Sequence, residues 1–348
     1  MAIQSGPLLA TTSAVLFGIS PVLCKMVIGE MSPALLAGLL YLGSGIGLQI
    51  LLLFQRRNSL LELRQLSPRH RIKLLGAVVS GGVIAPLCLT YGIKYGNASE
   101  VTLLLNLETV ATTVIAWLIF KEYIGARVWI GKALILIAAV IVIVKSEGGF
   151  DFSISGILVV LACIFWGIDN NLTREVEELS STVLASVKGL AAGIFTILLA
   201  LLFSSGDATH VQIGGSLLIG ALSYGLSLVL FVEALRKIGS ARTATFFATG
   251  PFVGTLMSII LLGERPSVSY WFAVSLMLAG VFLLYNEVHR HLHTHKTMIH
   301  SHRHVHDEHH QHEHEGETPE TAHEHSHVHS VITHSHGHWP DIHHRHSH

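Results

Sequence analysis

The segments LIFKEYIGARVWIGKALILIAAVIVIV (118–144) and IILLGERPSVSYWFAVSLMLAGVFLLY (259–285) match each other at an offset of 142 residues. Each segment leads from one apolar stretch, through a short polar loop, into a second apolar stretch. The identical residues that this offset superposes include Glu122 with Glu264 and Trp129 with Trp271. These matches predict an internal repeat built from apolar helices, with chance similarity between such helices as the alternative.

Apolar segments of this length recur along the chain. Half of the 348 residues are hydrophobic and only 13% are charged. A helix of ~20 apolar residues crosses the ~30 Å hydrocarbon core of a bilayer and satisfies its own backbone hydrogen bonds there. The sequence therefore predicts an all-α integral membrane protein with ten transmembrane helices, at about residues 8–28, 34–54, 74–95, 98–120, 126–144, 155–174, 182–203, 213–235, 240–262 and 267–287.

A second match extends the repeat toward the start of each half. FGISPVLCK (17–25) matches WGIDNNLTR (166–174) at an offset of 149 residues. Each half then contains five spans, and an odd number makes the two halves cross the membrane in opposite senses, as in many secondary transporters. We expect a first five-helix repeat at 1–145, a second, inverted repeat at 146–287 and a tail at 288–348.

The basic residues of the loops predict the orientation of these spans. The loop 55–73 holds six of them, namely Arg56, Arg57, Arg64, Arg69, Arg71 and Lys73. Because cytosolic loops carry the excess of lysine and arginine, we expect this loop and both chain termini in the cytosol. Residues 1–7 contain no basic residue, so we expect no cleaved signal peptide. The expected location is the plasma (inner) membrane, crossed many times.

The repeated motifs resemble a known family. LLLNLETVATTVIAWLIFKE (103–122) and FWGIDNNLTR (165–174), with the loop, Glu and Trp pattern that occurs twice, are similar to the EamA domain of the drug/metabolite transporter superfamily. The resemblance covers about residues 8–287 and implies a ten-helix transporter with two five-helix repeats around a central cavity. Two features depart from it: Gly250 stands where the first half has Glu108, and the chain carries a long histidine-rich tail.

Glu108 is the first candidate site residue. It lies near the centre of the predicted fourth span, with Asn106 two residues before it. An ionisable side chain at that depth costs at least ~2.5 kcal/mol, so it must face protein or water. We expect this carboxylate to bind a cation or to carry a proton. A protonated glutamate that only ties helices together is the alternative.

The second half contributes a lysine and three consecutive polar residues. Lys188 lies about a third of the way into the seventh span, where it would extend to the cytosolic surface, pair with Glu108 or hold an anionic substrate. Asp169, Asn170 and Asn171 cannot all point the same way on a helix, so at least one should face the bundle interior. The alternative for these three is a helix end in contact with cytosolic water.

Other unusual residues in the spans are expected to have structural roles. Lys132 and Glu233 lie near the predicted cytosolic ends, where the lysine should reach the surface and the glutamate should pair with Arg236 or Lys237. Three prolines within the spans are expected to kink their helices, namely Pro21, Pro86 and Pro251. Three cysteines are expected to be small buried side chains, namely Cys24, Cys88 and Cys163.

The tail holds 23 of the chain's 25 histidines, interleaved with other residues rather than in the unbroken run of an engineered tag. A segment this polar cannot bury a core, so we expect it to be disordered when unbound. Neutral imidazole binds Zn, Ni, Co and Cu, and histidines two residues apart can close around one ion. We expect such binding, with no obligatory cofactor, at His291, His293, His295, His302, His304, His306, His323, His325, His327, His329, His334, His336 and His338.

These features predict a transporter and not an enzyme. The chain lacks a G-x-x-x-x-G-K-S/T phosphate loop, so gradient-driven alternating access is simpler than ATP-driven pumping. We expect export of a small organic metabolite or drug, with the tail as a metal-binding regulator or buffer. The alternatives are a divalent transition-metal exporter fed by the tail and a membrane metal sensor. The expected partners are the lipid bilayer and the substrate, without nucleic acid, and a homodimer is left open.

Overall fold

The computed structural model describes residues 5–57, 59–121, 124–145, 151–176, 178–204, 207–285, 289–295, 298–304, 323–329 and 332–338. The chain divides into two compact units, which are Met1–Glu287 with Pro340–His348, and Val288–Trp339. The first unit contains all the predicted spans, and the second contains most of the tail.

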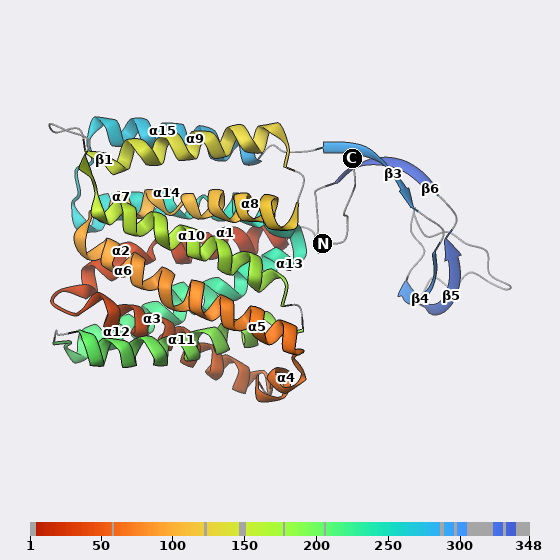
Figure 1. The fold of residues 1–348 in the computed structure, drawn as a ribbon, viewed down its shortest axis with the longest axis horizontal. Helices are drawn as coiled ribbons and strands as arrows, with labels where there is room; N and C mark the ends of the chain where they lie inside the picture. Colours follow the sequence, from red (N-terminus) through yellow and green to blue (C-terminus); the bar gives the residue numbers. More distant parts are fainter. Residues whose placement is uncertain are drawn as a thin grey trace. The chain divides into compact units, whose positions relative to one another are not determined.

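Helices make up almost all of the described part of the first unit (Figure 1). In chain order they are α1 (Ser5–Gly18), α2 (Ser20–Ile28), α3 (Pro33–Phe54), α4 (Ser59–Gln65), α5 (Pro68–Ala77), the π-helix η2 (Val78–Ile84), α6 (Ala85–Tyr95), α7 (Ala98–Leu104), α8 (Leu107–Phe120), α9 (Ala126–Ile143), α10 (Ile154–Arg174), α11 (Ser181–Phe203), α12 (His210–Ile219), the π-helix η3 (Gly220–Leu226), α13 (Ser227–Phe247), α14 (Gly250–Leu262) and α15 (Val268–Tyr285). Two short antiparallel strands, β1 (Val144–Lys145) and β2 (Asp151–Phe152), flank the boundary between the predicted repeats.

Eight segments of the described chain are helical, long and apolar enough to cross a bilayer. They are Ser5–Ile28, Pro33–Phe54, Pro68–Tyr95, Ala98–Phe120, Ala126–Ile143, Ile154–Arg174, Ser181–Phe203 and His210–Ile238. The last two predicted spans correspond to shorter apolar helices, Gly250–Leu262 and Val268–Leu284. In addition, α13 is continuous where a loop is predicted between residues 235 and 240. A helical membrane protein is thus confirmed, and the count of ten spans stays a prediction.

The outward surface of these helices is rich in large apolar side chains. Leu53, Phe54, Leu202 and Phe203, for example, are 73%, 84%, 74% and 81% exposed. In water an apolar surface of this kind would promote association, whereas lipid tails are as apolar as the side chains themselves. The surface therefore fits a bilayer environment.

Serine and threonine side chains cap several helices. Ser32, Ser67, Ser153, Ser180 and Thr209 each accept a hydrogen bond from the backbone N–H three residues further on. The first N–H groups of a helix have no partner within the helix, and a side-chain oxygen supplies one. These caps explain why α3, α5, α10, α11 and α12 begin where they do.

Several spans are interrupted at mid-length. The breaks lie at Ile19 between α1 and α2, at 105–106 between α7 and α8, and at 248–249 between α13 and α14. Pro21 and Pro251 lie in the first turn after a break, and Pro86 lies in the first turn of α6 after η2. Proline fits there because the N–H that it lacks would have no helical partner. Pro21 and Pro251 therefore begin new helical pieces, whereas Pro86 lies within the continuous helical segment Pro68–Tyr95, and the kinks expected at these prolines stay a prediction.

Elements of the two halves recur at the offset found in the sequence. The π-helices η2 and η3 begin 142 residues apart and end 142 residues apart, as do α9 and α15. The residues that end α8 and α14 in a left-handed conformation, Lys121 (φ 52°) and Gly263 (φ 65°), show the same offset. Because π-helices are rare, their recurrence at equivalent places favours a repeat over chance similarity.

Glycines allow α3 and α11 to pack closely. A Cβ atom at Gly189 would lie 2.6 Å from the backbone nitrogen of Gly45, and one at Gly193 would collide with the backbone of Leu42. Small residues at such a contact let two backbones approach and gain van der Waals packing that lipid does not supply. The contact joins the two predicted halves, and it places Lys188, which precedes Gly189, inside the bundle.

The second unit contains the strands β3 (His289–His295), β4 (Met298–His304), β5 (His323–His329) and β6 (Ile332–His338). β3 pairs with β6 and β4 pairs with β5, and both pairs are antiparallel. Histidine stands opposite histidine at three register positions of each pair. The expected disorder of the tail is not confirmed by these strands, and the predicted ligand His306 lies outside the described residues.

Candidate substrate site

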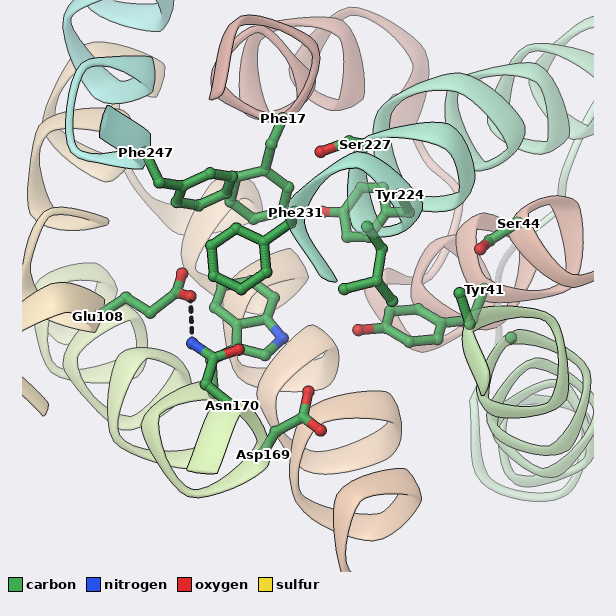
Figure 2. Close-up of a pocket in the computed structure, with 14 residues that line it drawn as sticks. Phe17, Tyr41, Ser44, Glu108, Asp169, Asn170, Tyr224, Ser227, Phe231 and Phe247 are labelled. Carbon is green, nitrogen blue, oxygen red and sulfur yellow. Dashed lines mark hydrogen bonds between the residues drawn. The ribbon is translucent and has the colours of Figure 1, made fainter. Parts of the chain in front are cut away.

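A cavity lies inside the first unit, between elements of both predicted halves (Figure 2). It contains about 540 Å³ of space that atoms do not fill, part of which is open to solvent. Its lining consists of Phe17, Tyr41, Ser44, Glu108, Trp166, Asp169, Asn170, Ala185, Gly189, Tyr224, Ser227, Leu228, Phe231 and Phe247. These residues come from α1, α3, α8, α10, α11, η3 and α13, so the cavity depends on how the halves meet.

Glu108 reaches the cavity from the break between α7 and α8. It stands in the first turn of α8 and is 7% exposed. The side-chain amide of Asn170 donates to Glu108 Oε1 over 2.8 Å and to Thr112 Oγ1 over 3.2 Å. The first turn of a helix favours a carboxylate because its N–H groups carry partial positive charge. The break thus places a carboxylate inside the bundle, at the edge of a cavity.

Lys188 is bound to Asp169. Its Nζ lies 2.5 Å from Oδ1 and 2.7 Å from Oδ2 of Asp169, and 3.3 Å from the hydroxyl oxygen of Thr173. Lys188 is 1% exposed, so the expectation that it extends to the cytosolic surface is wrong. Its ion-pair partner is Asp169 rather than Glu108. With its charge neutralised in this way, the lysine is not free to hold an anionic substrate.

The other two predicted asparagines are not among the residues that line the main cavity. The amide of Asn171 donates to the backbone oxygens of Thr112 and Gly167, over 3.1 Å and 2.8 Å, and so ties α10 to α8. Asn106 is fully buried in the break, with Nδ2 3.5 Å from Sδ of Met277. Three of the predicted residues therefore line the main cavity: Glu108, Asp169 and Asn170.

Aromatic rings form much of the cavity wall, and none of them is among the predicted site residues: Phe17, Tyr41, Trp166, Tyr224, Phe231 and Phe247. Neighbouring rings have centroids 4.8–5.7 Å apart, and Phe17 is the centre of the chain of contacts. One feature of the sequence pointed to them. The match of FGIS with WGID superposes Phe17 on Trp166, and the structure brings these two rings to 5.5 Å.

One backbone carbonyl positions two of these aromatic side chains. The hydroxyl of Tyr41 donates to the oxygen of Gly81 over 2.5 Å, and Nε1 of Trp166 donates to it over 3.1 Å. Gly81 lies in η2, and π-helical turns alter the regular helical pairing of the backbone, often at functional sites. A side chain at Gly81 would also collide with the carboxylate of Asp169. η2 therefore holds the aromatic wall and the ion pair in place together.

A second, smaller cavity adjoins the first. The two share four lining residues, which are Glu108, Asn170, Phe231 and Phe247. The second cavity is also lined by Arg174, whose guanidinium lies 4.7 Å above the ring of Phe120 and 4.0 Å from the carboxylate of Glu175. Arg174 is the last residue of α10. Together the cavities outline a path from mid-span toward one end of the bundle.

Two charged residues have partners other than those expected. Lys132 is 4% exposed and donates to the backbone oxygen of Thr109 over 2.9 Å, so the expectation that it reaches the surface is wrong. Glu233 accepts a hydrogen bond from Ser181 over 2.5 Å, and Arg236 donates to a backbone carbonyl over 2.5 Å. These contacts stand in place of the ion pair expected for Glu233.

In the described part of the chain, no group of three or more His, Cys, Asp or Glu side chains is placed to hold a metal ion. Neither histidine nor cysteine lines the main cavity as described. Cys24 and Cys163 are buried and Cys88 is half-buried, and all three are free thiols. The side chains of the tail histidines lie outside this description, so metal binding there stays a prediction.

Known proteins with similar sequences cover most of the chain. A family model described as the EamA-like transporter family matches residues 4–144 and 153–286. An uncharacterized transporter of Methanothermobacter thermautotrophicus is 28% identical over 291 residues, which is 79% of this chain and 84% of the relative. YedA, an uncharacterized inner membrane transporter of Escherichia coli, is 23% identical over 278 residues, which is 78% and 87%. A crystal structure with 17% identity has a TM-score of 0.64 over 81% of this chain and 98% of its own, which shows a shared fold.

Proposed function

The chain belongs to the EamA-like transporter family, and on that premise we propose that it is a secondary transporter that exports a small organic metabolite or drug. The main support is the cavity beside Glu108, because it lies at mid-span and is lined by residues of both halves. Ligand sites of secondary transporters lie near the bilayer midplane, where helices are discontinuous. We place the protein in the plasma (inner) membrane, with both termini in the cytosol.

The proposed architecture has ten spans in two inverted five-helix repeats, at 1–145 and 146–287. The shared offset of η2 and η3, of α9 and α15, and of the left-handed helix ends supports it. The two segments that match the family model, 4–144 and 153–286, divide the chain at nearly the same place. In this arrangement α14 and α15 are the ninth and tenth spans.

Alternating access would rock one half against the other, so contacts between the halves must break in turn. At one end, Lys73 Nζ of the first half lies 3.1 Å from Glu175 of the second. At the other end, the carboxylate of Glu264 accepts hydrogen bonds from the backbone N–H groups of Ala98 and Ser99, over 2.7 Å and 2.8 Å. Each set joins the two halves at its own end of the bundle, so we expect it to break when that end opens.

Glu108 is the proposed carrier of a proton or a cation. Its place at the border of the two cavities lets it contact a ligand in either one. Return of a proton to this carboxylate after release of substrate would couple export to a proton gradient. The path around it is formed by Asn106, Asp169, Asn170, Asn171 and Lys188.

Transport in proteoliposomes tests this function. The intact chain should move an organic solute under an imposed pH gradient faster than protein-free vesicles do. Glu108→Gln should lower the rate at least about tenfold, since a neutral amide cannot exchange a proton or balance a cation. Normal transport by both Glu108→Gln and Lys188→Ala would show that the site assignment is wrong. Failure of the folded protein to move cationic, neutral and anionic organic solutes alike would count against the function.

The tail favours a second candidate function. Histidines stand opposite one another in its strand pairs, which supports binding of Zn, Ni, Co or Cu. We propose that the bound metal regulates transport or is buffered by the tail, and that the protein needs no obligatory cofactor. The alternative is that the protein exports the metal itself or senses it. Metal flux with Ni, Zn and Co, compared between the intact chain and a chain that ends at Asn286, separates these roles. Metal movement above protein-free vesicles would establish export, and binding without movement would establish a buffer or a sensor.

A further inference from the structure

The charges around the main cavity do not cancel. Asp169 is neutralised by Lys188, which contacts both of its carboxylate oxygens. Glu108 has an uncharged amide, that of Asn170, as its described side-chain partner. Among the described residues that line this cavity there is no lysine, arginine or histidine. If Glu108 is ionised, the lining carries one uncompensated negative charge, which would attract a cation and repel an anion.

The rest of the wall discriminates between kinds of cation. Divalent metal ions such as Ca²⁺ take six to eight oxygen ligands, and transition metals prefer imidazole or thiolate. The cavity instead presents aromatic rings, which bind organic ammonium groups through cation–π attraction when the charge lies within about 6 Å of a ring centroid. A carboxylate surrounded by rings therefore suits a cation whose charge is covered by carbon atoms.

The geometry brings the rings and the carboxylate together. Figure 2 shows Glu108 and Asn170 pointing toward each other, with the ring of Phe231 beside them. The ring centroid of Phe231 lies 4.8 Å from that of Phe247, which in turn lies 5.3 Å from that of Phe17. Glu108 belongs to the first predicted half and Phe231 to the second, so the carboxylate and the rings act together only when the halves meet.

We propose that the substrate is a small organic monocation, namely a protonated amine or a quaternary ammonium compound. Its charged group lies at Glu108, and its carbon substituents lie against Phe17, Phe231 and Phe247. The inference rests on the proposed transport function and names the substrate class of the same site.

The first test compares three probes of similar shape on the unmodified full-length chain in lipid nanodiscs. Choline is the cation, 3,3-dimethylbutan-1-ol is its neutral carbon analogue, and 3,3-dimethylbutanoate is an anion with the same tert-butyl group. Calorimetric titration should show choline binding at least about tenfold more tightly than the alcohol, with the anion weaker still. Equal affinities, the reverse order or no binding of choline would overturn the proposal without any variant having to fold.

Two variants locate the preference. Glu108→Gln should bring the ratio of choline affinity to alcohol affinity close to one. Glu100→Gln is the matched control, because Glu100 is a carboxylate of α7 that is not among the cavity-lining residues. It should keep the ratio of the unmodified chain. The assignment of the cation preference to Glu108 would be overturned if Glu108→Gln kept the affinity ratio of the unmodified chain. It would also be overturned if both variants lowered this ratio equally.

Flux of the same three probes into proteoliposomes separates this inference from the proposed function. Movement of choline alone supports both. Movement of the alcohol or the anion without choline supports transport and overturns the cation assignment. Choline-selective binding that depends on Glu108, with no movement of any probe, supports the cation site and counts against transport of that ligand class.

Discussion

The break between α7 and α8 and the break between α13 and α14 occupy equivalent places in the two halves but serve different purposes. At the offset of 142, Glu108 in the first corresponds to Gly250 in the second. Glu108 reaches a cavity, whereas a side chain at Gly250 would collide with the backbone of Ala14. One break presents a carboxylate to open space, and the other lets two helices touch. The repeat thus provides a common frame, and the departures from it mark the site.

The buried ion pair shows the same asymmetry. Asp169 corresponds to Ser20 at the offset of 149. When the starts of α3 and α11 are aligned, Lys188 corresponds to Leu40. Each of the three ionisable residues at the cavity therefore has an uncharged counterpart in the other half. A pair of halves with identical charges would present two like charges in one small space, and the difference between the halves avoids this.

Lys188→Ala should have the largest effect on stability. It leaves the carboxylate of Asp169 buried without its partner, which costs about 3–5 kcal/mol of unfolding free energy. Denaturant or thermal unfolding of the purified protein measures the loss. The double variant Asp169→Ser with Lys188→Leu copies the residues of the first half and should recover most of it. An unchanged stability of the single variant would contradict the buried pair.

Gly250→Ala should come next. The added Cβ would press against the oxygen of Ala14 and force α14 away from α1, and overpacking of this kind costs about 1–3 kcal/mol. Gly214→Ala is the control, because a Cβ at Gly214 meets no atom within 4 Å. It should not lower the unfolding temperature. Equal losses in the two variants would show that the second break is not a packing contact.

Glu264→Gln should have a moderate effect. The carboxylate binds two N–H groups at the start of α7, and loss of a helix-capping interaction costs about 0.5–2 kcal/mol. The residue at the same place in the first half, Glu122, lies outside the described residues. An equal loss for Glu122→Gln in parallel unfolding curves would extend the symmetry of the halves to their loops. If Glu122→Gln leaves the stability unchanged, the capping contact of Glu264 is a further difference between the two halves.

The smallest effect on stability is expected from a change of pH, which acts on the exposed contact of Glu178 with the first half. Glu178 accepts a hydrogen bond from Ser67 N–H over 2.9 Å, and Nδ1 of His70 lies 2.8 Å from its other carboxylate oxygen. The hydrogen bond from Ser67 holds the pKa of Glu178 below the usual 4.5. A carboxylate with a lowered pKa stabilises the fold above its unfolded pKa, and this contribution disappears as the pH falls through the folded pKa. Unfolding curves of the intact chain and of Glu178→Gln should differ at neutral pH and converge as the pH falls below the folded pKa of Glu178. A constant difference would contradict this link.

Much of the fold could be predicted because a bilayer constrains both length and composition. The eight long spans agree with the predicted segments, and the depth of Glu108 correctly placed it inside a helical bundle. The depth of Lys188 left extension to the surface open, and its burial excludes that alternative. The rotation of a helix about its axis could not be predicted in the same way. Lys132 lies at a depth from which a lysine usually reaches the surface, yet it points inward. In spans that are apolar on all sides, no periodicity distinguishes the inner face.

The partners of individual side chains also could not be predicted from the sequence. Lys188 binds Asp169 on a different helix, and the choice between this residue and Glu108 depends on how α10 and α11 cross. The aromatic wall draws on α1, α3, α10, η3 and α13, and only the match of Phe17 with Trp166 hinted at it. Contacts between distant segments of this kind require the tertiary structure.

The π-helices have a consequence for comparing chains of this type. Such a turn accommodates one residue more than the α-helix around it, so η2 and η3 each hold an inserted residue. Deleting the extra residue within Val78–Ile84 would let the span wind as a regular helix, with α5 and α6 in nearly the same relative rotation. The carbonyl of Gly81 would then take part in regular helical pairing instead of accepting hydrogen bonds from Tyr41 and Trp166. A gap of one residue at 78–84 or 220–226 in an alignment would therefore identify relatives whose cavity wall is assembled differently.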